Sequence, residues 1–381
     1  MENTQKSDQI NSNKKTIIFL ISRRADQEIR TPKIMDVLKK TGYNTILLNW
    51  DRNDTTIPPD SNYSEIQLKF KALTEKKVIF YWPIWWIFLL KNLLKLEWDV
   101  VYSVNFDSIL PALIAAKIKR KKVIYELLDI VELSNLVPPL LNDVFLFFDK
   151  ILMNLSDVVV CVDEMQKLGI GGIPNKHVEI IYDSPPYIDI EEKSPQEFTL
   201  GKFTLFYAGA LFKSRNLNLE NVLSAIKSIN GTQMIIAGEG DMVETIRIWE
   251  KEYPDKVRYL GKITYRDVII MGLKSDLFFI LRDANVPANR YTCGSTIFNA
   301  MRCGKPILAN KNTSTSNIVL KEKCGLCVDE HNVEEIRNAI LKLKADPKLC
   351  NFFGANARKA YDSIYSWEIM SQKIIDLVSS I

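Results

Sequence analysis

Short apolar runs alternate along the chain with segments in which apolar residues recur every three or four positions. Thr16–Ile21 (TIIFLI) and Thr45–Leu48 read as buried strands, and Pro32–Lys40 between them reads as a helix. Uninterrupted apolar strands separated by helices are typical of a parallel sheet that is covered on both faces. The same pattern predicts further strands in the first half at Val100–Ser103, Lys122–Tyr125, Val158–Val162 and Val178–Ile181.

The alternation stops once and then starts again. Asp183–Lys202 contains three prolines and several acidic residues, a composition that is typical of a linker. After it, strands are predicted at Thr204–Tyr207, Gln233–Ala237, Val257–Leu260, Leu277–Leu281, Pro306–Ala309 and Gly325–Val328. We therefore expect an α/β protein with two Rossmann-like, doubly wound parallel-sheet domains facing a cleft, where ligands bind beyond the carboxyl ends of the strands.

This organisation divides the chain into five parts. We expect a disordered tail at 1–14, a first domain at 15–190, a linker at 191–202 and a second domain at 203–365. The last part, 366–381, is expected to be a helix that packs back toward the first domain.

Composition limits the function classes. The chain has 381 residues and a net charge of +4, which is too small to indicate a nucleic-acid partner. Its six cysteines are scattered rather than arranged as a disulfide framework, and the polar N-terminus lacks the apolar core of a signal peptide. We expect a cytoplasmic protein with reduced thiols.

One segment leaves two interpretations open. Val78–Leu90 is uncharged, contains six aromatic residues and is too short to span a bilayer. It is either a buried helix or a patch that contacts the inner face of the cell membrane, since Trp and Tyr favour the bilayer interface. Lysines flank it on both sides, at Lys76, Lys77, Lys91 and Lys95.

Glycine-bearing turns follow two predicted strands of the second domain. Gly209 ends the run FYAG, and Gly238 and Gly240 lie in IIAGEG. Glycine lets a backbone approach a ligand closely, although many such turns are only tight turns. Arg215 follows in the first loop, where a guanidinium can bind a diphosphate through two hydrogen bonds or simply lie on the surface.

A third loop, within ANRYTCGSTIFNAMRCGKP (288–306), precedes a short predicted helix. Ser295 or Thr296 can cap that helix, and Gly294 precedes them. The amide groups and the dipole at a helix start favour an anion. The three turns together predict an anion-binding site in the second domain.

These motifs carry a resemblance to a family. The second half resembles the donor domain of the retaining, nucleotide-sugar-dependent glycosyltransferases of family 4, also called group 1, which have the two-domain GT-B fold. The residues that match are FYAGALFKSRNL, MIIAGEGD, VRYLGKI, SDLFFI, NAMRCGKPIL, CGLCV and EEIRNAILKL. The first half is similar more loosely, at RTPKIMDVLKKTGYNTILLNWDR, DVVYSVNFDSILPALIAAKIKRKKVIYELLD and SDVVVCVDEM.

The resemblance implies roles for individual residues. It places Arg215 on the donor diphosphate, Gly238, Glu239 and Gly240 near the nucleobase or diphosphate, and the loop Cys293–Thr296 on the diphosphate and sugar. Two positions depart from the family pattern. Its paired glutamates read Tyr291 and Asn299 here, and Asn299 would hydrogen-bond the ribose without a charge. A histidine common in the acceptor domain reads Leu128.

The expected reaction moves a sugar from a nucleoside-diphosphate sugar to an acceptor hydroxyl with retention of configuration. The acceptor is expected to be a glycan or a lipid-linked glycan, in polysaccharide or glycolipid synthesis. Asp107 and Asp129 follow strands of the first domain and could orient it, while Lys213 and Arg290 are additional cations near the diphosphate. The chain contains no Asp-x-Asp triplet, so no metal is expected, and no cofactor is expected beside the donor.

Other interpretations stay open. The substitutions Tyr291 and Asn299 would also suit an inactive, glycosyltransferase-like scaffold subunit, and a nucleotide-sugar 2-epimerase could share the fold. Cys324 and Cys327 form a C-x-x-C pair, but a four-ligand zinc site would need a second pair at suitable spacing. The base and sugar of the donor, the acceptor and the oligomeric state stay open.

Overall fold

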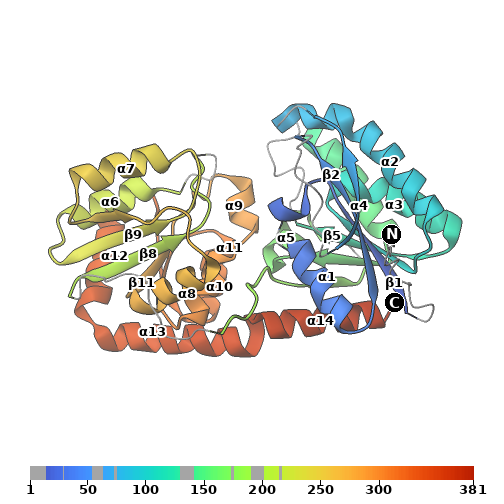
Figure 1. The fold of residues 1–381 in the computed structure, drawn as a ribbon. Coiled ribbons are helices and arrows are strands. Elements are labelled where there is room, and N and C mark those ends of the chain that lie inside the picture. Colours follow the sequence, from blue (N-terminus) through green and yellow to red (C-terminus); the bar gives the residue numbers. More distant parts are fainter. Residues whose placement is uncertain are drawn as a thin grey trace, which may run out of the picture. The chain divides into compact units, whose positions relative to one another are not determined.

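The computed structural model describes residues 14–28, 30–53, 63–72, 75–128, 141–172, 176–189, 201–213 and 217–381. The chain forms two compact units, which are described separately here (Figure 1). Unit 1 comprises Met1–Val162, Ile170–Ile181 and Ser371–Ile381, and unit 2 comprises Asp163–Gly169 and Tyr182–Met370. The tail residues 1–13 and residues 190–200, which include most of the expected linker (191–202), lie outside the described residues.

Unit 1 is built on a parallel sheet of seven strands in the order β3-β2-β1-β4-β5-β6-β7. Its strands are β1 (Thr16–Ile21), β2 (Asn44–Asp51), β3 (Ser64–Lys69), β4 (Val100–Val104), β5 (Lys122–Leu127), β6 (Val158–Cys161) and β7 (Val178–Ile180). Its helices are α1 (Arg30–Lys40), α2 (Trp82–Lys95), α3 (Phe106–Lys119), α4 (Asn142–Leu155) and the end of α14 (Trp367–Ser379).

Successive side chains along the central strands point to opposite faces of this sheet. Ile18 and Leu20 of β1 belong to a core shared with α2, α3 and α4, while Phe19 between them stacks on Tyr102 at 5.0 Å. All six β1 residues are buried. Figure 1 shows α2, α3 and α4 on one face and α1 on the other.

The aromatic segment 78–90 forms the 3₁₀ helix Glu75–Tyr81 and the first part of α2. Pro83 lies in the first turn of α2, where its missing N–H costs nothing. Trp85 is fully buried and stacks on Trp50 at 5.9 Å, whereas Phe80 and Ile87 are exposed. The segment is therefore a core helix with an apolar outer side.

Unit 2 is built on a parallel sheet of six strands in the order β10-β9-β8-β11-β12-β13. Its strands are β8 (Phe203–Ala208), β9 (Thr232–Ala237), β10 (Val257–Tyr259), β11 (Leu277–Ile280), β12 (Ile307–Asn310) and β13 (Gly325–Val328). Its helices are α5 (Glu164–Gly169), α6 (Leu219–Lys227), α7 (Val243–Glu252), α8 (Tyr265–Lys274), α9 (Pro287–Tyr291), α10 (Thr296–Arg302), α11 (Ser314–Lys321), α12 (Val333–Ala345) and α13 (Pro347–Ala360), followed by a π-helical turn (Tyr361–Tyr365) and the start of α14.

The two doubly wound sheets that the sequence predicts are confirmed. Every strand predicted from an apolar run coincides with an observed one. β3 was not predicted because its sequence, SEIQLK, is mostly polar, and both its ends are exposed at the edge of the sheet.

Candidate functional site

The two glycine turns of unit 2 pack directly against each other at the carboxyl ends of β8 and β9. The N–H of Gly209 donates to the Ala237 carbonyl at 3.1 Å, and the N–H of Leu211 donates to the Glu239 carbonyl at 2.9 Å. A Cβ atom on Gly238 would lie 1.9 Å from the Gly209 carbonyl oxygen. This close approach, together with a φ of +142° at Gly238, requires glycine.

The start of α10 adjoins the same edge of the sheet. The Thr296 hydroxyl donates to the Ala208 carbonyl at 3.3 Å, and a Cβ on Gly209 would lie 3.6 Å from that hydroxyl. Ser295 is at the N-cap position, but its side chain makes no capping hydrogen bond, so the expected side-chain cap is not formed. Among the described residues, the N–H groups of Ser295 and Thr296 have no hydrogen-bond partner. The structure thus brings Gly209, Gly238 and Thr296 together.

Asp163 holds the loop that leads into α10, a role that sequence reasoning missed. Its carboxylate accepts the N–H of Cys293 at 2.9 Å and the hydroxyl of Ser314. Burial first, and then the nearby Asp163 charge, raises the pKa of the Cys293 thiol well above its ordinary value. The thiol is therefore neutral and is a poor nucleophile or metal ligand. Asp163 lies two residues beyond the end of β6, and that position was its only signal in the sequence.

Arg282 is a second residue that sequence reasoning missed. Its guanidinium lies against Gly294, where a Cβ would be 2.6 Å from Nη2, and its Nε is buried with no hydrogen-bond partner among the described residues. Its backbone N–H donates to Asn310 Oδ1 at 3.2 Å. The signal available was an arginine two residues beyond β11, at the carboxyl edge of the sheet. Arg282 adds a positive charge beside the loop 293–296.

The residues at the two glutamate positions have different environments. The Tyr291 ring packs on Gly169, where a Cβ would lie 3.0 Å from the ring. Asn299 is buried in α10, and its Oδ1 has no hydrogen-bond partner in the described part of the chain. Tyr291 thus has a packing role, whereas Asn299 has an unused acceptor.

The remaining donor-side candidates are surface residues or lie outside the described residues. Arg290 is exposed, and Glu239 forms an exposed ion pair with Lys262 at 2.9 Å. The Lys213 backbone N–H donates to Asp241 Oδ1 at 2.7 Å, which ties the loop after β8 to the loop after β9. Arg215 lies outside the described residues, so its role stays a prediction.

On the acceptor side, Asp107 lies in the first turn of α3 within a polar network. Its Oδ2 accepts the hydroxyl of Ser22, and Arg52 Nη2 lies 3.4 Å from the same oxygen. Burial lowers the pKa of Arg52, with Asp107 acting in the opposite direction. These side chains come from the carboxyl ends of β1, β2 and β4, where an acceptor is expected. Asp129 lies outside the described residues.

Groups that could hold a metal are limited among the described residues. Asp283, Glu330 and His331 bring one potential ligand atom each to within 4.8 Å of one another. The Glu330 carboxylate already accepts the Ala284 N–H at 2.7 Å, and Nε2 of the exposed His331 lies 3.6 Å from Asp283 Oδ1. The hydrogen bond to Ala284 accounts for the position of Glu330.

The C-x-x-C pair has the environment of structural thiols. Burial raises the pKa of Cys324 to about 12 and that of Cys327 to about 11. Both thiols are therefore protonated near neutral pH, which does not favour metal binding or redox exchange.

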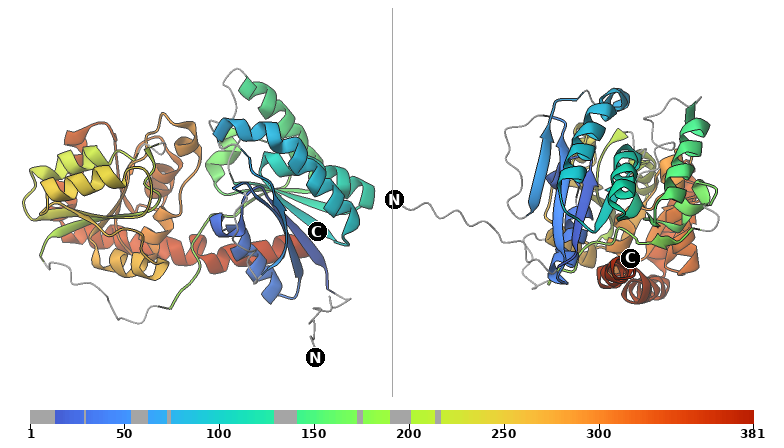
Figure 2. Two further views of the ribbon diagram at one scale, coloured as in Figure 1. Left: turned by 45° about the horizontal axis from the view of Figure 1, so that its top comes forward. Right: turned by 90° about the vertical axis from the view of Figure 1, so that its right-hand side faces the viewer.

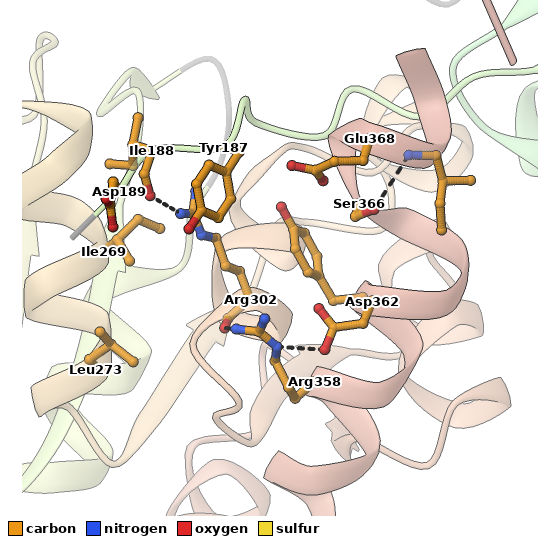
Figure 3. Close-up of a pocket in the computed structure, with 12 residues that line it drawn as sticks. Tyr187, Ile188, Asp189, Ile269, Leu273, Arg302, Arg358, Asp362, Ser366 and Glu368 are labelled. Carbon is orange, nitrogen blue, oxygen red and sulfur yellow. Dashed lines mark hydrogen bonds and ion pairs between the residues drawn. The ribbon is translucent and has the colours of Figure 1, made fainter. Parts of the chain in front are cut away.

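A cavity of about 510 Å³ lies elsewhere in unit 2, beside α8 and α13 (Figure 3). Arg302 enters it and donates to the carbonyls of Pro186 at 3.1 Å and Ile188 at 2.7 Å. Arg358, also at its wall, pairs with Asp362 at 2.8 Å. Both cations are used in holding the chain at 186–188 and the end of α13, so this cavity does not compete with the loop cluster as the donor site.

A family model matches within unit 2, and a relative matches a longer part of the chain. Residues 189–360, which contain the glycine turns and α10, match the family model of glycosyl transferases group 1. An uncharacterized glycosyltransferase of Methanocaldococcus jannaschii is 25% identical over 317 residues, 76% of each chain. Residues 189–360 are thus similar to group 1 glycosyl transferases, and the relative extends the similarity to 76% of the chain.

Two solved structures share the architecture of the chain. The sucrose-phosphate synthase of Thermosynechococcus elongatus has a TM-score of 0.76 at 15% identity, covering 96% of this chain and 99% of its own. HepE of Anabaena, solved with UDP and glucose, has a TM-score of 0.71 at 17% identity, covering 96% and 100%. At these identities the likeness shows the fold, which is GT-B.

Proposed function

We propose that the protein is a retaining glycosyltransferase of the family 4 type, which moves a sugar from a nucleoside-diphosphate sugar to an acceptor hydroxyl. The observation that supports this most directly is the packing of the Gly209 and Gly238 turns beside Thr296, within the region that matches the group 1 family model. The UDP held by HepE is consistent with such a donor.

In the proposed reaction, the site has to stabilise the negative charge that develops on the departing diphosphate. Fixed N–H groups and cations lower the barrier because they are already oriented when that charge develops. The amides of Ser295 and Thr296 and the guanidinium of Arg282 are suited to this role. Arg215, which lies outside the described residues, is proposed to add a further cation. Arg290 and Lys213 are exposed cations nearby in the chain.

Asn299 is proposed to bind the ribose. Its unpaired Oδ1 is shielded from solvent in the structure, so the carboxamide has to turn before it can accept a hydroxyl. A neutral hydrogen bond is weaker than the charge-assisted bond of a glutamate. We therefore expect modest donor affinity rather than loss of binding.

The acceptor proposal rests on unit 1. Asp107, with Ser22 and Arg52, is proposed to orient a glycan or lipid-linked glycan, and Asp129 is proposed to lie in the same region. The reaction is proposed to need no metal or further cofactor, so it should continue in EDTA.

A donor screen tests the proposal. UDP-, GDP- and ADP-sugars are added separately and the melting temperature is measured. A ligand at about 100 times its Kd adds about 2.7 kcal/mol to the free energy of unfolding. Arg215→Ala should abolish the shift, whereas Lys342→Ala, an exposed lysine of α12, should leave it unchanged.

Product analysis then separates the alternatives. A retaining transferase gives a product whose anomeric configuration matches that of the donor, as read by NMR. Turnover of donor to its 2-epimer without any acceptor would show the epimerase instead. A chain whose melting temperature no nucleotide or nucleotide-sugar shifts would be the inactive scaffold.

A further inference from the structure

The outer side of unit 1 carries apolar side chains where a soluble α/β protein normally carries charge. On α4, Phe147, Phe148 and Leu155 are 62%, 53% and 65% exposed. Val144 and Ile151 complete a stripe at helical spacing along the same side. The inner side of α4 holds Asp149, which is buried and accepts the Tyr125 hydroxyl at 2.7 Å. This helix thus has a charged side chain on its inner side and large apolar side chains on its outer side, the reverse of the usual amphipathic arrangement.

Neighbouring helices extend the apolar surface. α3 packs against both α2 and α4, and the right-hand view of Figure 2 shows the three helices side by side over the sheet of unit 1. We name their exposed apolar residues the helical face, and it contains Ile84, Ile87, Leu94, Ile114, Ile118, Val144, Phe147, Phe148, Ile151 and Leu155.

Basic residues lie between and just beyond the apolar residues of this face on α2 and α3. Lys91, Lys95, Lys117 and Arg120 are exposed, and none of them forms an ion pair within the described part of the chain. Three acidic residues lie nearby: Asp149, which is buried; Glu97, which is 92% exposed and pairs with Lys119 at 3.3 Å; and Asp143, which is exposed. Helices α2 and α3 therefore present net positive charge at their C-terminal halves.

We propose that the helical face is a docking surface for an anionic lipid bilayer. Apolar side chains interspersed with lysine and arginine match a membrane interface, in which the former enter the acyl boundary and the latter meet the headgroups. Protein interfaces, by contrast, are depleted of lysine at their centres. The proposal concerns unit 1 alone and does not depend on the donor or the reaction.

The face lies on the surface rather than spanning the bilayer. Lys77–Lys95 is long and apolar enough, by length and composition, to cross a membrane. However, Trp82, Trp85, Leu89 and Leu93 of α2 belong to the core of unit 1. Pulling α2 out of the core would expose the strands that it covers, so only its outer stripe is available to lipid.

Flotation with vesicles tests the proposal on the full chain without nucleotide or sugar. The vesicles contain 30% phosphatidylglycerol in phosphatidylcholine, and a second set contains phosphatidylcholine alone. We expect binding to the anionic set, and much weaker binding to the neutral one. Removing two inserted aromatic rings in F147S/F148S should weaken binding at least about tenfold. Reversing two charges in K91E/K95E should weaken it by more than about tenfold as well.

Matched controls exist on unit 2. Ile248 and Phe352 are exposed apolar residues there, and Lys342 and Lys348 are exposed lysines. I248S/F352S and K342E/K348E should bind vesicles as the wild type does. Circular dichroism and the melting temperature should be unchanged in all four variants, since the side chains that change are exposed.

Four results would overturn the proposal. In the first, the wild-type chain does not float with anionic vesicles, and in the second, F147S/F148S binds them as the wild type does. In the third, the wild-type chain stays on the vesicles after an alkaline carbonate wash, which indicates a segment that spans the bilayer. The fourth is a concentration-dependent dimer in sedimentation that F147S/F148S abolishes, because the face would then serve a second copy of the chain. If no nucleotide-sugar shifts the melting temperature but the chain still floats with anionic vesicles, the proposed glycosyltransferase function is rejected and the proposed docking surface is not.

Discussion

Replacing Gly238 by alanine tests the contact on which the donor site is built. The new Cβ would lie 1.9 Å from the Gly209 carbonyl oxygen, whereas real Cβ contacts stay above 3.0 Å. The two turns therefore have to separate by more than about 1 Å, and overpacking of this kind typically costs about 1–3 kcal/mol. A φ of +142° adds a backbone cost of about 1–3 kcal/mol for any residue with a side chain.

Gly261 is the matched control for this substitution. It also has a positive φ, +71°, but a Cβ placed there meets nothing within 4 Å. Gly261→Ala should thus lower the free energy of unfolding by about 1–2 kcal/mol, which is the backbone cost alone. Gly238→Ala should lower it by about 2–6 kcal/mol, the sum of the two costs given above.

Chemical denaturation measures both values, and calorimetry with the best nucleotide from the screen measures donor affinity. We expect the affinity to fall in Gly238→Ala and to be kept in Gly261→Ala. Equal stability of the two variants would show that the turns do not pack as described. Unchanged nucleotide affinity in a destabilised Gly238→Ala would remove these turns from the donor site.

Three further predictions concern groups outside the donor site. Arg30→Met removes the partner 2.6 Å from the buried Glu126 carboxylate and should lower the free energy of unfolding by about 3–5 kcal/mol, with partial recovery in R30M/E126Q. Equal stability of Arg30→Met and the wild type would contradict this. Burial raises the pKa of Glu28 above its usual 4.5, so its contribution to the free energy of unfolding is full below pH 4.5 and is lost as the pH rises through the pKa of the folded state. Denaturation at several pH values should therefore show a smaller decline of that free energy with rising pH in Glu28→Gln than in the wild type. With a pKa of about 11 at Cys327 and about 12 at Cys324, thiol reagents should label the native chain slowly at pH 7–8 and rapidly after unfolding, and fast native labelling would refute the burial described.

The sheets could be predicted from the sequence because buried parallel strands are almost continuously apolar. Runs such as Thr16–Ile21 and Leu277–Leu281 leave little room for another interpretation. β3 was missed because an edge strand that is half solvated has a polar sequence. Short helices such as α11 were missed since their caps, here Thr313 with Ser316, are local hydrogen bonds with weak sequence signals.

The candidate site was predictable only in part. Glycines after strands pointed to Gly209 and Gly238 because the carboxyl ends of neighbouring parallel strands meet. The roles of Asp163 and Arg282 depend on contacts with the loop 293–294, which lies far from Asp163 in sequence. No spacing rule reports such pairs, and the same holds for the packing of Tyr291 on Gly169.

The outward stripe of α4 was not recognised from sequence for a different reason. A helical apolar period indicates an amphipathic helix but not which side faces the core. Asp149 lies on the inner side because it bonds to the Tyr125 hydroxyl, and Phe147 and Phe148 are thereby turned outward.

The division of the chain between the two units has a consequence for biosynthesis. Ser371–Ile381 belongs to unit 1, and Ile374, Leu377 and Val378 are buried there. Domains usually fold from the N-terminus while the chain is being translated. Here the first unit to emerge from the ribosome lacks Ser371–Ile381 until every residue of unit 2 has been made. A truncation after Met370 would therefore damage the unit whose other residues are synthesised first.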